Sequence, residues 1–139
     1  MGTDIHIHVE LRLEEGGRWV HWNAPHIKRN YALFTKLANV RGCPGVTPIS
    51  NPRGLPADIS ELTHLARAED DDCHSDSWIS RDEIRQVAEW WERERILRDL
   101  HSEEWFEPAV MGGYLIGNGY TSDLPDWVAD VRLVFWFDN

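Results

Sequence analysis

The chain has 139 residues, a formal net charge of −10 and a hydrophobic content of 42%. This length indicates a single domain spanning 1–139, and the composition excludes a chain that is disordered throughout. The acidic balance disfavours direct binding of duplex nucleic acid, which needs basic side chains. It still permits a nucleotide substrate bridged by a metal ion, or docking on a basic protein surface.

The sequence shows no visible signal for export or for membrane insertion. No apolar run approaches the roughly 20 residues of a membrane helix, and residues 3–12 alternate instead of forming an apolar signal core. We therefore expect a cytoplasmic protein with two reduced thiols, Cys43 and Cys73, although a disulfide or a zinc site on these cysteines stays open. The eight tryptophans favour core packing, with a stacking platform for bases or sugars as the alternative.

The first element is a strand with strict alternation over residues 4–13. Its even positions are polar and its odd positions are apolar, which is typical of a strand with one buried face. A glycine turn follows, and residues 18–22 read as the returning strand of a hairpin. Asn30 then predicts a helix cap, with the helix running from Tyr31 to a stop at Gly42.

The middle of the chain begins with a loop, residues 42–57, that holds four prolines and is a candidate binding loop. Asp58 and Glu61 have capping-box spacing and predict a short helix to about Ala68. We expect the acidic run 69–72 and the following residues 73–78 to form a loop.

The last third contains the longest predicted helix and a final strand. Ser80 and Glu83 form a second capping box that opens a helix over about 81–101. A glycine-rich loop is expected over 107–127, and the alternating run 130–138 predicts a strand. The predicted fold is α+β: a small antiparallel or mixed sheet that includes the N-terminal hairpin and the C-terminal strand, with about three helices packed on one side.

The polar face of the first strand is the strongest candidate for a metal site. Asp4, His6 and His8 project side by side, and two histidines with a carboxylate suit a divalent metal such as zinc or manganese. Such a metal would activate a bound water as a nucleophile. The alternative is an ordinary solvated strand face.

A second group precedes the long helix. His74 or Asp76 could complete the metal shell, or His74 could act as a general base, against the alternative of an exposed loop. Three arginines, Arg29, Arg41 and Arg53, could clamp an anionic group in bidentate fashion, against the alternative of pairing with the surplus acids.

Several segments resemble a family of small bacteriophage and prophage proteins. The resembling segments are Met1–His6, Arg29-Asn30-Tyr31 with Leu33-Phe34, Pro52–Pro56, His74-Ser75 with Ser77-Trp78, and Val131–Asn139. The family pattern matches at Asp4, His6, Arg29, Asn30, Tyr31, Arg53 and His74, but members often have an aromatic residue in place of His8 and a histidine in place of Asp76. The resemblance implies a phage accessory protein acting in the host cytoplasm, with no activity to carry over.

Two hypotheses follow from the sequence. The first is a metal-assisted hydrolase of a phosphoester or nucleotide-like substrate, in which Asn30 or Tyr31 orients the substrate and His74 takes part in catalysis. The second is a non-enzymatic protein that blocks a basic host surface or sequesters a nucleotide signal. The hydrolase requires His6 and His74 to converge on one pocket. The sequence leaves the oligomeric state open.

Overall fold

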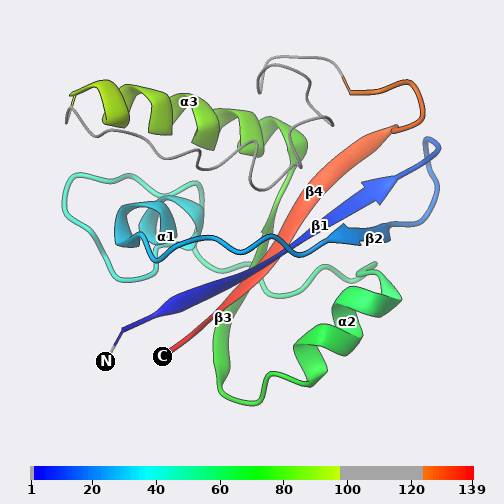
Figure 1. The fold of residues 1–139 in the computed structure, drawn as a ribbon, viewed down its shortest axis with the longest axis horizontal. Helices are drawn as coiled ribbons and strands as arrows, with labels where there is room; N and C mark the ends of the chain where they lie inside the picture. The colour runs from blue at the N-terminus through cyan, green and yellow to red at the C-terminus, as the bar shows by residue number, and fades with distance from the viewer. Residues whose placement is uncertain (1, 98–123) are drawn as a thin grey trace.

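The computed structural model describes residues 2–97 and 124–139, with backbone only for 95–97. The described residues form a four-stranded antiparallel sheet in the order β2-β1-β4-β3 and three helices, which confirms the predicted α+β class (Figure 1). The elements in chain order are β1 (Asp4–Arg12), β2 (Val20–Asn23), α1 (Tyr31–Ala38), α2 (Glu61–Ala68), β3 (Cys73–Ile79), α3 (Arg81–Leu97) and β4 (Asp130–Asp138).

The two central strands, β1 and β4, pair along their whole length from Asp4↔Asp138 to Arg12↔Asp130. The pairing puts the apolar side chains of β1 on one face with Val131, Leu133, Phe135 and Phe137 of β4, whereas Val134 and Trp136 lie on the other face. Directly opposite residues of antiparallel strands share a face, so this register also fixes which polar residues lie together on the other face.

The apolar face of the sheet packs against α1 and α3, which lie together on one side (Figure 1). Ile7, Leu133 and Phe135 of the sheet are fully or almost fully buried there, as are Phe34 of α1 and Val87 of α3. This layer is the main hydrophobic core of the described chain. No described helix is long and apolar enough to cross a membrane.

The opposite face of the sheet is also covered, which differs from the one-sided packing expected from the sequence. α2 lies on that side, and the segment before it crosses toward β1 (Figure 1). His8 and Glu10 of β1 are therefore buried, although the alternating pattern suggests a solvated face. A period of two shows which residues share a face but does not show what packs on it.

The sequence predicts four helix ends, and the structure confirms two of them, the caps at Asn30 and Ser80. Asn30 accepts a hydrogen bond from Leu33 N, and Ser80 and Glu83 form the predicted capping box. The cap of α2, however, is Ser60 and not Asp58. α1 ends at Asn39 in a left-handed conformation, three residues before the predicted Gly42.

Residues 73–79 form the edge strand β3, where we expected a loop. Ser75 has a positive φ of 58°, and the pairing with β4 shifts between His74 and Ser77. This bulge breaks the alternation, so the segment carries no period-two signal. The predicted helix 81–101 is confirmed as α3 to Leu97, and its remainder and residues 107–123 of the predicted glycine-rich loop lie outside the described residues.

Candidate functional site

A pocket of about 640 Å³ lies on the α2 face of the sheet, where β1 ends and β4 begins. We call it the strand-end pocket. Its wall consists of residues from both central strands, the loop before α2 and the start of α3: Arg12, Trp19, Leu55, Pro56, Ala57, Asp58, Trp78, Ser80, Arg81, Asp82, Asp130, Val131 and Arg132. This volume is in the range of pockets that enclose small ligands.

Two arginines contact the ring of Trp19 in the wall of this pocket. The guanidinium carbon of Arg132 lies 4.2 Å from the ring centroid and that of Arg12 lies 4.5 Å from it. Both distances are within the range of cation–π attraction. Arg12 Nε is buried and has no hydrogen-bond partner among the described residues. The Trp19 ring and the two guanidinium groups therefore form one packed part of the wall, and Arg12 Nη2 also pairs with Asp58 Oδ2 at 3.4 Å.

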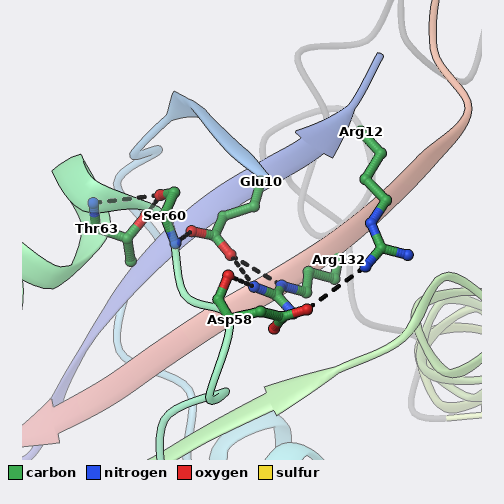
Figure 2. Close-up of polar contacts among 6 residues, drawn as sticks. All are labelled: Glu10, Arg12, Asp58, Ser60, Thr63 and Arg132. Carbon is green, nitrogen blue, oxygen red and sulfur yellow. Dashed lines mark hydrogen bonds and ion pairs between the residues drawn. The ribbon is translucent and has the colours of Figure 1, made fainter. Parts of the chain in front are cut away.

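Arg132 is fixed beneath the pocket by a buried ion-pair network (Figure 2). Its Nε donates to Glu10 Oε1 at 2.8 Å, and its Nη1 donates to Asp58 Oδ1 at 2.8 Å. Glu10 Oε2 in turn accepts the Ser60 backbone N–H at 2.8 Å, which fixes the start of α2. The network therefore joins β1 and β4 to the loop before α2 at the pocket wall.

The Glu10 carboxylate is completely buried. Burial alone raises the pKa of a carboxyl group, but hydrogen bonds from Ser60 and Arg132 outweigh it, so that the pKa of Glu10 is lower than its ordinary value of 4.5. The Arg132 guanidinium likewise lowers the pKa of Asp58. Both groups are therefore negatively charged at neutral pH and neutralise Arg132.

The start of α3 forms another part of the pocket wall. The backbone N–H groups of Arg81 and Asp82 open the helix and have no acceptor within it, so this end carries partial positive charge. No described residue forms an ion pair with the Arg81 side chain. Because the first turn also carries the carboxylates of Asp82 and Glu83, the Arg81 side chain is the part of this end that is available to an anionic group.

A second group of chemically reactive side chains lies at the opposite end of the sheet. His6, Cys73 and Asp138 come from β1, β3 and β4, and among the described residues they are the one set of three potential metal ligands that converge. Their ligand atoms all lie within 4.8 Å of one another. His6 Nε2 and Asp138 Oδ2 are 2.5 Å apart. Burial raises the pKa of the Cys73 thiol to about 11.

Three of the four predicted metal ligands have other partners. Asp4 accepts two hydrogen bonds from Arg29, which lower the pKa of this carboxyl group. Asp76 is paired with Arg67 at 2.8 Å. Only His6 belongs to the converging set.

His8 is the third predicted metal ligand with other partners, and it is packed inside the protein. Its ring stacks on Trp136 with centroids 4.7 Å apart, and its Nδ1 lies 3.1 Å from His21 Nε2. Burial, together with the nearby His21, lowers the pKa of His8 to about 4. His8 is therefore a neutral packing residue at physiological pH.

The structure brings His6 and His74 to the same end of the sheet but onto opposite faces. His74 lies opposite Phe137, a core residue on the helix side, whereas His6 lies opposite Trp136 on the α2 side. His74 Nε2 is 3.2 Å from Asn139 Oδ1. The predicted convergence of the two histidines on one pocket is therefore wrong, because adjacent residues of β4 point to opposite faces.

The other predicted binding residues are distributed over several contacts. Tyr31 accepts a hydrogen bond from Thr3 N, and Arg41 stacks on the Tyr31 ring at 4.4 Å. Asn30 has a structural role as the cap of α1. None of these lines the strand-end pocket.

The predicted Arg53 lies closer to this pocket but does not line it. It forms a bidentate pair with Glu83 and stacks over Trp78, which does line the pocket. The hydrogen bond from Arg53 lowers the pKa of Glu83. Arg53 therefore supports the pocket wall from behind.

Sequence reasoning missed the residues that line the pocket and two of the three converging ligands. Arg12 and Arg132 lie in β1 and β4, Trp19 precedes β2 and Trp78 lies in β3, but nothing in their local pattern shows that they meet. A comparison of the chain with protein-family models, with curated proteins and with solved structures found no match.

Proposed function

We propose that this chain is a binding protein that takes a small, planar, anionic ligand of the nucleotide class into the strand-end pocket and releases it unchanged. The observation that carries this proposal is the combination, in one pocket of about 640 Å³, of tryptophan and arginine surfaces with the start of a long helix. This combination matches the two parts of a nucleotide, a flat base and a phosphate.

The base would stack against Trp78, which is partly exposed, since stacking on an aromatic ring tolerates any base. The phosphate would pair with the Arg81 guanidinium at the start of α3, on the side away from the carboxylate of Asp82. The carboxylates of Asp58 and Asp130 could accept hydrogen bonds from ribose hydroxyls.

We propose binding without turnover because no histidine or cysteine stands among the described residues of the pocket wall. The converging metal ligands among the described residues include His6 of β1. His6 precedes Arg12 of the pocket wall by six residues, which corresponds to about 20 Å along a strand. A metal held there could not activate water against a ligand in the strand-end pocket.

The metal-assisted hydrolase stays a prediction with weaker support. It depended on a shared pocket for His6 and His74, and these side chains lie on opposite faces of the sheet. A divalent metal is still a reasonable proposal, but its ligands would be His6, Cys73 and Asp138. A sulfur ligand favours zinc over manganese.

The phage setting implied by the resemblance gives the binding role a biological meaning. A protein that retains a nucleotide without converting it would lower the free concentration of that nucleotide in the host cytoplasm. Blocking a basic host protein is the related alternative, for which the net charge of −10 is the supporting observation.

The test is equilibrium dialysis of the protein against mono- and triphosphates of adenosine and guanosine, followed by chromatography of the recovered nucleotide. We expect retention of unchanged nucleotide and quenching of tryptophan fluorescence. Arg81→Ala and Trp78→Leu should each weaken binding by roughly tenfold or more, as expected for loss of one charged or stacking contact.

The matched control is Arg93→Ala, an exposed arginine three turns further along α3, which should leave binding unchanged. New products in the recovered nucleotide would favour the hydrolase instead. Absence of binding by all four nucleotides, or binding that both pocket variants leave intact, would refute the proposed function.

A further inference from the structure

The cluster of His6, Cys73 and Asp138 is independent of the strand-end pocket. The three residues occupy neighbouring strands, because β4 lies between β1 and β3. Cys73 is directly opposite Asp138 in the sheet. His6 is opposite Trp136, two residues from Asp138 and therefore on the same face. The sheet register, rather than a chance meeting of long side chains, brings these groups together.

We propose that His6, Cys73 and Asp138 form a zinc site that joins the three strands at the end of the sheet. The set supplies one nitrogen, one sulfur and one oxygen, and all three are ligand types that zinc takes in proteins. Their ligand atoms lie within 4.8 Å of one another, so small side-chain rotations would bring all three to a common ion.

The surroundings of the cluster favour a cation. The run Glu69-Asp70-Asp71-Asp72 leads directly into Cys73, and Asp70 is fixed by a hydrogen bond from Trp136 Nε1 to its Oδ2 at 2.8 Å. Asp4 also lies on this face, opposite Asp138 in the register. Arg67 donates to the Cys73 backbone oxygen at 3.2 Å, but its charge is paired with Asp76, and that of Arg29 is paired with Asp4.

The geometry leaves the fourth position of a tetrahedral ion to water or an outside ligand. His6 and Asp138 are both partly exposed, with side-chain exposures of 38% and 34%, so an ion could enter from solvent. Three protein ligands with one open position distinguish this arrangement from the closed sites of purely structural zinc. The inference does not depend on the proposed function, since the strand-end pocket lies at the other end of β1.

The experiment uses tag-free, reduced protein titrated with cobalt(II), which reports a sulfur ligand by a thiolate-to-metal charge-transfer band. We expect one equivalent to bind with this band and with the visible bands of a tetrahedral ion, and zinc to displace it. Zinc should also raise the melting temperature of the wild type.

Four variants identify the ligands. Cys73→Ser should abolish the charge-transfer band, and His6→Gln and Asp138→Asn should each weaken cobalt and zinc binding by at least tenfold. Cys43→Ser is the matched control and should keep the band, because Cys43 lies in the loop after α1. Far-ultraviolet circular dichroism without metal identifies any variant that fails to fold, and Asp138→Asn keeps the side-chain shape.

Two results would overturn the proposal. One is a wild type that shows no thiolate band and no zinc-dependent melting shift. The other is a band that survives in Cys73→Ser or disappears in Cys43→Ser, because either would assign the sulfur ligand elsewhere.

Discussion

The buried pair of Glu10 and Arg132 yields the most demanding stability prediction. Glu10→Ala removes the acceptor of Arg132 Nε and of the Ser60 backbone N–H, while Arg132 keeps its bond to Asp58. Removing one partner of a buried ion pair costs about 3–5 kcal/mol. Because Asp58 still neutralises part of the remaining charge, we expect a cost near the lower end of this range.

The free energy of unfolding from urea denaturation measures this cost directly, and the melting temperature should fall by about 10 °C for a loss of about 3 kcal/mol in a domain of this size. Asp58→Ala is the comparison, because the Asp58 side chain is 58% exposed and its ion pair is accessible to water. We expect it to cost about 1 kcal/mol or less.

A double variant, Glu10→Met with Arg132→Met, distinguishes the cost of an unpaired buried charge from the loss of the ion pair itself. It replaces both charges by apolar side chains, so it should be more stable than Glu10→Ala alone, since no buried charge is left without a partner. A cost below about 1 kcal/mol for Glu10→Ala, or equal costs for Glu10→Ala and Asp58→Ala, would refute the reasoning that burial makes this pair important.

Three further predictions concern other parts of the fold. Because the pKa of His8 falls from 6.5 to about 4 on folding, the unfolded chain binds more protons between these values, so stability should rise from pH 4 to 6.5 and then level off. His8→Phe, which keeps the stack on Trp136, should flatten this rise in melting curves recorded across that range. Asn39→Val should cost about 1–2 kcal/mol in urea denaturation, because a β-branched residue does not tolerate the left-handed φ of 57° there, whereas Asn39→Gly should be nearly neutral. Glu83→Ala should cost about 1–2 kcal/mol, since it loses both the cap of α3 and the pair with Arg53, and unchanged stability would contradict this role.

The sequence predicted well those elements that depend on local pattern. Residues 4–13 alternate cleanly, and residues 130–138 place Val131, Leu133, Phe135 and Phe137 on one face, so both segments were recognisable as strands. Asn30 and Ser80 were recognisable as caps, since a cap depends only on the next three residues. β3 was missed because its bulge at Ser75 interrupts the alternation.

The sites were less predictable, because they depend on contacts between distant segments. Glu10 and Arg132 are 122 residues apart, and neither has a local feature that identifies the other. His6 was predicted to be a metal ligand from its strand position, but Cys73 and Asp138, with which it converges, follow only from the strand order. The strand order decides which residues meet, and it cannot be read from a single sequence.

The position of β1 and β4 side by side at the centre of the sheet has a consequence for synthesis. During translation, β1 emerges from the ribosome long before its principal partner, so the central ladder cannot form until residues 130–138 have left the exit tunnel. Pairing across such a long stretch of chain also slows folding. A nascent chain halted within α3 should therefore expose the apolar side of β1 and be a good substrate for chaperones and proteases.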